Sequence, residues 1–169
     1  MQGGNTVTAY IALGANLGDA SAALKAAVQA ISRLPFTRLG RTSSVYRTAP
    51  LDTDLSSESP AAGDDYLNAV VEVHTALSAT DLLDHLQHIE NAAGRERPYR
   101  NAPRTLDLDL LLYGAAATSS ARLTVPHPRM MQRAFVLVPL AEIAPALVSE
   151  VQLGAVAHQA IARLGLLQD

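Results

Sequence analysis

Residues 104–113 read Arg-Thr-Leu-Asp-Leu-Asp-Leu-Leu-Leu-Tyr, an apolar segment that carries two carboxylates. Successive side chains of a strand point to opposite faces. A strand here would have one face with Thr105, Asp107, Asp109 and Leu111 and one face with Leu106, Leu108, Leu110 and Leu112. The continuous leucine face is typical of a strand that is buried on at least one side. The sequence thus predicts a central strand whose other face presents both carboxylates.

The two carboxylates have a spacing that suits a metal ion. Same-face neighbours on a strand lie about 7 Å apart, and two anions at that distance repel each other unless a cation lies beside them. Mg²⁺ binds one or two protein carboxylates and completes its shell with water and phosphate oxygens. On its own, an Asp-x-Asp pair is more often a solvated strand face. The metal prediction therefore depends on the surrounding residues.

The residues before this strand are strongly cationic. Four arginines and two prolines fall within residues 95–104. The planar guanidinium group binds phosphate oxygens in bidentate fashion, and a loop of this kind can close over a polyphosphate. Taken alone, the arginines indicate an exposed charged loop. Next to Asp107 and Asp109, they favour a Mg²⁺ site that binds a phosphorylated substrate.

The rest of the chain alternates between strand and helix patterns. Strands are expected over 7–13, 41–48 and 66–75, helices over 19–34 and 78–94, and a C-terminal amphipathic helix from about 154 to 164. The order is that of a ferredoxin-like βαββαβ sandwich, an α+β fold in which helices pack on an antiparallel sheet. The first and last strands of that pattern would be central, which brings the strand of Asp107 and Asp109 beside the strand that ends in Gly14.

Length and composition limit the possible functions. The chain has 169 residues, a formal charge of −3, 49% hydrophobic residues and no cysteine. We expect a single domain over residues 1–169, without thiol chemistry or a disulfide framework. The acidic balance argues against general nucleic-acid binding, and the sequence has no apolar run long enough to span a membrane. The expectation is a cytoplasmic monomer that acts on small molecules and binds neither nucleic acid nor membrane.

Three other segments can contribute to a site. Residues 14–19 are glycine-rich, but they lack the Gly-Lys-Ser/Thr ending of a phosphate loop and Lys25 is the only lysine, which excludes a P-loop hydrolase. His127 lies between two prolines that restrict its backbone, and a phosphate contact and a structural role are both open. Tyr66 and Asn68 share one strand face. They can bind a flat heterocycle, or they can be the polar edge of an ordinary strand.

Five segments together resemble the successive motifs of 6-hydroxymethyl-7,8-dihydropterin pyrophosphokinases. In order, they are Tyr10–Gly18, Ser43–Leu51, Asp65–Ala69, Pro103–Asp109 and Leu123–Arg129. No single segment is decisive, but five collinear segments through most of the chain are highly specific. The resemblance implies transfer of a pyrophosphoryl group from ATP to the hydroxymethyl group of the reduced pterin, with release of AMP, in folate biosynthesis.

The resemblance also implies roles for individual residues. Two Mg²⁺ ions would be held by Asp107 and Asp109, and ATP would be the co-substrate. The residues implied around ATP are Gln87, Glu90, Arg95, Arg97, Arg104, Leu123, Thr124, His127 and Arg133, of which Arg95, Arg97 and Arg104 would share catalysis with the two aspartates. The residues implied around the pterin are Thr48, Pro50, Leu51, Tyr66, Asn68 and Phe135. No general base is apparent, and such a transfer depends mainly on alignment and on cations that absorb charge.

The chain departs from the family pattern at three places. The loop after Leu51 is several residues longer than in compact members, Ala49-Pro50 replaces a double proline, and the arginine loop lacks a tryptophan before its final Pro-Arg. Tyr99 is our hypothesis for the missing aromatic contact. Residues 52–65 are expected to be either a lid or locally disordered. Two other functions use the same residues: a catalytically silent ligand-binding domain, and a phosphohydrolase that uses the metal pair on water.

Overall fold

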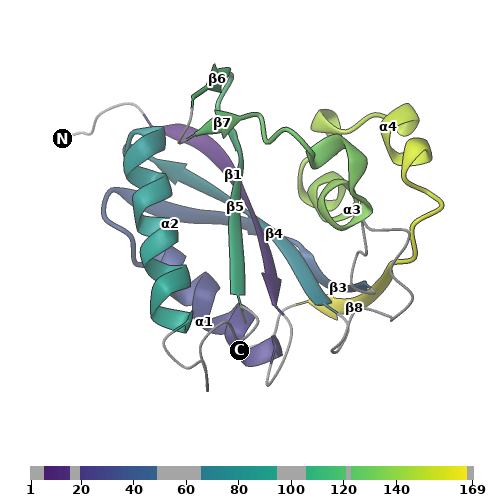
Figure 1. The fold of residues 1–169 in the computed structure, drawn as a ribbon, viewed down its shortest axis with the longest axis horizontal. Helices are drawn as coiled ribbons and strands as arrows, with labels where there is room; N and C mark the ends of the chain where they lie inside the picture. The colour runs from purple at the N-terminus through teal and green to yellow at the C-terminus, as the bar shows by residue number, and fades with distance from the viewer. Residues whose placement is uncertain (1–5, 16–19, 49–65, 95–105, 121–122, 167–169) are drawn as a thin grey trace.

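An antiparallel sheet forms the centre of the molecule (Figure 1). The structure is a computed structural model that describes residues 6–15, 20–48, 66–94, 106–120 and 123–166. The sheet contains β1 (Val7–Ala15), β2 (Thr37–Thr42), β3 (Ser44–Thr48), β4 (Tyr66–Thr75), β5 (Leu106–Tyr113) and β8 (Ala162–Leu166). Its strand order is β5-β1-β4-β3-β8, and β2 pairs with β4 beside β3. A small hairpin of β6 (Thr118–Ser119) and β7 (Thr124–Val125) follows β5.

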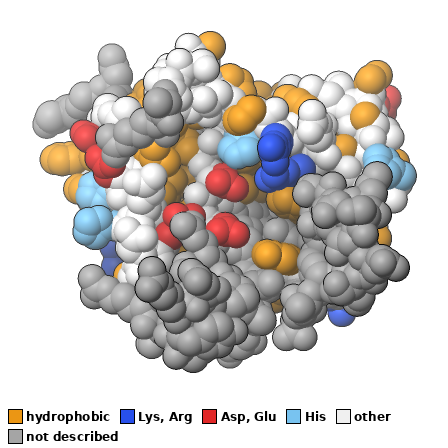
Figure 2. Space-filling view, in the orientation of Figure 1, with side chains coloured by type: hydrophobic (Ala, Val, Ile, Leu, Met, Phe, Trp, Pro, Cys, Tyr) orange, Lys and Arg blue, Asp and Glu red, His pale blue; other side chains and the backbone are white. Residues whose placement is uncertain are grey.

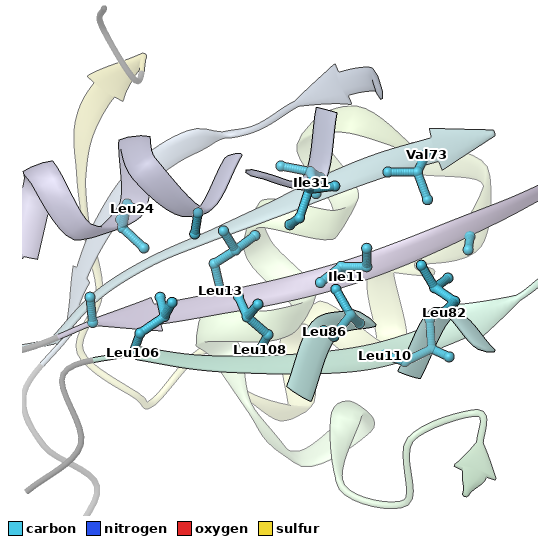
Figure 3. Packing of buried hydrophobic residues seen from close by; sticks show 14 of the residues in the cluster. Ile11, Leu13, Leu24, Ile31, Val73, Leu82, Leu86, Leu106, Leu108 and Leu110 are labelled. Atoms are coloured by element: carbon cyan, nitrogen blue, oxygen red, sulfur yellow. The ribbon is translucent and has the colours of Figure 1, made fainter. Parts of the chain in front are cut away.

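Two helices cover one face of the sheet, α1 (Ala20–Ser32) and α2 (Ala79–Gly94). The apolar residues of β5 point to this face, as their alternation predicts. Figure 3 shows the packing of Ile11, Leu13, Leu24, Ile31, Val73, Leu82, Leu86, Leu106, Leu108 and Leu110. Burial of one such side chain stabilises the fold by about 1.5–3 kcal/mol. This face is therefore the main core, and the opposite face is left for other roles.

Helix α3 (Ala134–Ile143) covers part of the opposite face (Figure 1). Its buried residues pack on Tyr10 and Ala12 of β1 and on Val70 of β4. The short helix α4 (Glu150–Ala155) follows it. Among the described residues, this apolar contact ends at Ala12 on β1, and the next residue of that strand on the same face is Gly14. A polar part of the sheet surface begins there.

The prediction of a helix over residues 154–164 is wrong. The helical turns end at Ala155, and residues 162–166 form β8, which pairs with β3. Gly165 has a φ of 120°, which no helix contains. Leu164 and Leu166 are exposed, so the strand forms through backbone pairing and not through a buried face. Apolar periodicity could not reveal a strand of this kind.

Helix α3 itself was missed, because Pro139 lies inside it and nearly every other residue is apolar. A proline inside a helix removes one hydrogen bond and costs about 3 kcal/mol. Six residues of α3 are buried, Pro139 included, and their burial offsets this cost. The expected strand over 41–48 is likewise interrupted at Ser43. The Ser43 hydroxyl accepts the Val70 N–H over 2.9 Å, in place of a strand carbonyl.

The prediction of a ferredoxin-like α+β fold is confirmed, with one change in strand order. Strand β5 lies beside β1 as expected, but at the edge of the sheet and not at its centre. The register shifts between Tyr10 and Ile11. Because of this shift, Leu112 packs toward the α3 side and not with Leu110. Within the described residues, no helix has the length and apolar character needed to cross a membrane.

Candidate functional site

Polar residues form one row across the sheet where α3 no longer covers it. Gly14 of β1 is the register partner of Asn68 on β4 and of Asp107 on β5. Asn68 is in turn the partner of Tyr46 on β3. Register partners point to the same face of a sheet. Since Gly14 has no side chain, the bare backbone of β1 forms the floor between an amide and a carboxylate. A Cβ at this position would lie only 3.2 Å from Asn68 Oδ1.

Asp109 lies on the same face as Asp107, one row further along β5. Its partner on β1 is Ala12, and the Asp109 side chain is half-buried. The charges of Asp109 and Arg133 both act on the ring of His127, so the three side chains lie near one another. Figure 2 shows acidic side chains gathered beside a histidine and Lys or Arg side chains on this face. The site thus combines carboxylates, an imidazole and a cation.

Thr48 and Asn68 form the other end of the row. Both are buried, and Asn68 Nδ2 donates to Thr48 Oγ1 over 2.8 Å. This bond fixes the plane of the amide, whose second N–H and carbonyl oxygen are the groups that a ligand can pair with. Tyr66 is the register partner of Thr48 and is half-buried. An amide with a fixed orientation beside an aromatic ring is suited to the edge and face of a heterocycle.

Two further predicted residues stand at the beginning of α3. The guanidinium carbon of Arg133 lies 5.3 Å from the centroid of the Phe135 ring, within the range of a cation–π interaction. Phe135 is partly buried against the core under α3. The start of this helix therefore brings a cation and an aromatic ring to one location.

Glu90, near the end of α2, bonds to the backbone of β5. The Leu108 N–H donates to Glu90 Oε2 over 2.6 Å. Leu108 lies between Asp107 and Asp109 on the edge strand of the sheet. A charge-assisted bond from the helix thereby satisfies an N–H that points away from β1. It also fixes the backbone between the two aspartates.

The protonation of His127 follows from its contacts. The backbone N–H of His127 donates to the Leu111 carbonyl over 2.9 Å, which joins the segment after β7 to β5. The Arg129 N–H donates to Nδ1 over 3.2 Å, so the proton of the neutral ring is assigned to Nε2. Burial lowers the pKa of His127, the charge of Asp109 opposes this, and the Arg133 and Arg129 charges lower the pKa further. With its pKa below the ordinary value, the ring is neutral at pH 7 and offers one N–H donor.

Glu142, near the end of α3, ties this helix to β3. Its Oε1 accepts from the Ser44 N–H over 2.9 Å and from the Tyr46 hydroxyl over 2.7 Å, and its Oε2 accepts from the Ser44 hydroxyl over 2.8 Å. Arg163 Nη2 of β8 lies 3.5 Å from Oε2. Burial alone would raise the pKa of Glu142, but these partners outweigh it and hold the pKa below its usual range. Because Tyr46 is the register partner of Asn68, this network supports the Asn68 end of the row.

The remaining predicted residues lie elsewhere or outside the described part. Gln87 is exposed on α2, one turn before Glu90. Leu123 is buried in the core beneath α1 and α2, and Thr124 pairs with Ser119 in the small hairpin. The predictions for Pro50, Leu51, Arg95, Arg97, Arg104, Tyr99 and the loop 52–65 fall outside the described residues.

The donor set on β5 suits magnesium. In the described part of the chain, no three or more His, Cys, Asp or Glu side chains come together as a metal site, which is what a zinc site would need. Asp107 and Asp109 face the same way beside Gly14 and Ala12, residues with little or no side chain. Two carboxylates on one strand face match Mg²⁺, which binds one or two protein carboxylates and keeps its other positions for water and phosphate.

Sequence reasoning missed the residues that support the site from outside it. Glu142 and Arg163 belong to this group. One signal was present, because Glu142 is the only charged residue between Ala134 and Val148. A lone carboxylate in an apolar helix needs hydrogen-bond partners. Those partners lie on β3 and β8, and no local pattern could identify them.

Comparisons with known proteins show the family of the chain. The 7,8-dihydro-6-hydroxymethylpterin-pyrophosphokinase (HPPK) family matches residues 10–145. The chain is 51% identical over 142 residues to the 2-amino-4-hydroxy-6-hydroxymethyldihydropteridine pyrophosphokinase of Haemophilus influenzae, with 84% of each chain covered. It is 42% identical over 135 residues to the enzyme of the same name from Bacillus subtilis, covering 80% of this chain and 77% of that relative.

Solved structures show the same fold at low sequence identity. A crystal structure of an HPPK-DHPS in complex with substrates superposes with a TM-score of 0.62 at 12% identity and covers 91% of this chain, which spans 43% of that longer one. The wild-type HPPK-DHPS of Plasmodium falciparum gives a TM-score of 0.60 at 14% identity, over 83% of this chain and 38% of its own length. The family match includes the strand that carries Asp107 and Asp109 and the helix that begins after Arg133. The chain therefore belongs to the 7,8-dihydro-6-hydroxymethylpterin-pyrophosphokinase family.

Proposed function

We propose that the row formed by Asn68, Gly14 and Asp107 is where the reaction of this family takes place. The enzyme transfers the pyrophosphoryl group of ATP to the hydroxymethyl group of 6-hydroxymethyl-7,8-dihydropterin and releases AMP. Because AMP leaves, the hydroxymethyl oxygen bonds to the β-phosphorus while the bond from that atom to the α,β-bridging oxygen breaks. A heterocycle at Asn68 and a polyphosphate at Asp107 would meet over Gly14, and this juxtaposition carries the proposal.

The pterin would bind at the Asn68 end. Its ring edge presents adjacent donors and acceptors, which an amide held by Thr48 can match. Tyr66 and Phe135 would contact its faces, and both are partly buried rather than fully covered. The Asn68 amide is already ordered in the folded protein, so binding costs little further conformational entropy at this side chain. This favours binding of a rigid ligand.

Asp107 and Asp109 would hold the magnesium that accompanies ATP. When bound, Mg²⁺ neutralises phosphate oxygens and aligns the phosphate chain for in-line displacement. Glu90 supports this role because it fixes the backbone between the two carboxylates. We propose two ions, since each carboxylate offers more than one oxygen and the triphosphate supplies further ligands.

His127 and Arg133 would bind the triphosphate from the side of α3. The neutral ring of His127 donates from Nε2, because Nδ1 already accepts the Arg129 N–H. Arg133 would supply a fixed positive charge toward the same phosphates. The other predicted neighbours of ATP stay predictions: Gln87, Arg95, Arg97, Arg104, Leu123 and Thr124.

Product analysis tests the proposal. The chain is incubated with ATP, Mg²⁺ and the reduced pterin, and the nucleotide products are separated by chromatography. We expect AMP and pyrophosphorylated pterin in equal amounts. Asp107→Asn should abolish this signal, whereas Glu150→Gln, on exposed α4, serves as a charge-matched control that keeps it. ADP or free phosphate would instead indicate a kinase or a phosphohydrolase, and an absence of turnover would indicate a binding domain.

We also propose that residues 1–169 form one domain that acts as a cytoplasmic monomer. The described part of the site draws on β1, β3, β4, β5 and α3 of a single chain, so the row needs no second subunit. Sedimentation equilibrium of the purified chain, with and without ATP and Mg²⁺, measures the oligomeric state directly. A dimer under working conditions would contradict this part of the proposal.

A further inference from the structure

The side chain of Gln159, from the C-terminal part of the chain, makes two hydrogen bonds to the backbone at the start of α3. Gln159 Oε1 accepts the Ala134 N–H over 2.8 Å, and Gln159 Nε2 donates to the Gln132 carbonyl over 2.8 Å. The bonded groups lie directly before and directly after Arg133. We infer that Gln159 is a positioning residue that holds the backbone of Arg133 so that its guanidinium faces the phosphate end of the site. This inference rests on the proposed role of Arg133 in binding the triphosphate.

The start of α3 needs a partner from outside the helix. Arg133 is the residue before the first helical turn, with extended backbone angles of −128° and 117°, and it provides no side-chain cap. Ala134 is only 2% exposed, so its N–H is turned away from water and lacks a partner within the helix. Gln159 supplies the missing acceptor.

Gln159 is itself held in place. The backbone N–H of Gln159 donates to the Val156 carbonyl over 3.0 Å. Val156 is buried in the same apolar cluster as Leu137 and Leu140 of α3. The side chain therefore reaches back to α3 from a turn that is packed against α3, and both ends of the contact are fixed.

The backbone of Arg133 controls where its charge lies. The Arg133 carbonyl accepts from the N–H groups of Val136 and Leu137 over 3.1 and 3.0 Å, which orients the peptide toward the helix. The guanidinium lies over Phe135, and its charge acts on His127. A long side chain magnifies a small rotation of its backbone, and a displacement of about 1 Å in a phosphate contact can cost about 100-fold in rate. Gln159 restrains this rotation from both sides.

Steady-state kinetics in two backgrounds separate positioning from a general loss of stability. Gln159→Met keeps the length of the side chain and removes both hydrogen bonds, whereas Gln159→Glu keeps the acceptor for Ala134. We expect Gln159→Met to lower kcat/KM for ATP about tenfold, and Gln159→Glu by about threefold or less. His158→Ala, at an exposed neighbouring position, should stay within about twofold of the unmodified chain. Far-UV circular dichroism checks that each variant is folded.

The same substitutions in an Arg133→Ala background decide the question. If Gln159 acts through Arg133, Gln159→Met should change kcat/KM less than about twofold there, because residues that act as a unit are not additive. An equal loss in both backgrounds, or no loss in Gln159→Met alone, would overturn the inference and leave the proposed function intact. An Arg133→Ala variant with full activity would overturn both the role of Arg133 and the inference. Failure of the unmodified chain to form AMP would contradict the proposed function itself.

Discussion

Removing one hydroxyl from the Glu142 network should weaken the fold by a predictable amount. Tyr46→Phe deletes the group that donates to Glu142 Oε1 over 2.7 Å and leaves the ring in place. The carboxylate keeps its two bonds from Ser44 and the nearby Arg163 charge, so it is not left unpaired. A hydrogen bond to a charged acceptor contributes about 1.5–3 kcal/mol. We expect a loss of about 2 kcal/mol at pH 8, or about 4–8 °C in Tm for a chain of this size.

The pH dependence of this loss distinguishes the bond from a mere packing defect. Burial first, and then the bond to Glu142 and its negative charge, raises the pKa of Tyr46 to about 12 from 10.0. A folded-state pKa above the unfolded value gives stability that is complete below pH 10 and is lost as the pH rises toward 12. By pH 11 the unmodified chain has lost about 1.4 kcal/mol of its free energy of unfolding through Tyr46, from the linkage relation with these two pKa values. The Tyr46→Phe variant has no such group and does not lose this free energy. The stability difference between the variant and the unmodified chain should therefore be less than half as large at pH 11 as at pH 8.

Urea unfolding at pH 8 and pH 11, followed by far-UV circular dichroism, measures both values. The pKa of Tyr10 is also raised to about 12, but this residue is present in both proteins and its contribution cancels in the difference. A double-mutant cycle with Glu142→Gln should give a coupling energy of about 1–2 kcal/mol. A deficit that is equal at the two pH values, or no deficit at pH 8, would refute the reasoning.

Three other predictions concern the site. Asp107→Asn and Asp109→Asn should each lower the rate of AMP formation at least about 100-fold, measured by chromatography, because a neutral amide binds Mg²⁺ poorly; near-native rates would contradict their role. Gly14→Ala should raise KM for the pterin about tenfold, since its Cβ would press on Asn68 Oδ1 at 3.2 Å; an unchanged KM in steady-state kinetics would exclude this contact. Glu90→Ala should cost about 1–3 kcal/mol in urea unfolding by leaving a β5 N–H unpaired, and isothermal titration should show weaker Mg²⁺ binding in the presence of ATP; no change in either would argue against a positioning role.

The parts of the fold that local patterns determine were predictable from sequence. The alternation of leucine and aspartate fixed which face of β5 is buried, and Leu24, Ile31, Leu82 and Leu86 indicated the helices that cover it. Each of these elements buries one face, so its apolar residues recur at a regular spacing in the sequence. That spacing is visible without the structure. The collinear motifs also predicted residues for a pterin and a metal ion, and of these the described structure places Tyr66, Asn68, Asp107 and Asp109 on one face of the sheet.

The elements that failed prediction are those stabilised by distant partners. Helix α3 is apolar except for Glu142 and contains Pro139, so neither amphipathic period nor propensity marks it. Strand β8 exposes its leucines and depends on pairing with β3, as well as on the contact of Arg163 with Glu142. The Gln159 contact spans 25 residues. Such interactions exist only after the chain has folded, and no local sequence window contains both partners.

The core and the site constrain each other through the register of β5. Sliding this strand by one residue against β1 would turn Leu108 to the α3 side and bury Asp107 and Asp109 beneath α1 and α2. Burial of two carboxylates in an apolar core costs far more than the pairing of one strand can offset. The leucines that stabilise the core therefore also hold the carboxylates beside Gly14. The main core thus sets the positions of the two proposed metal ligands, and substitutions on the leucine face should weaken Mg²⁺ binding even though these leucines point away from the carboxylates.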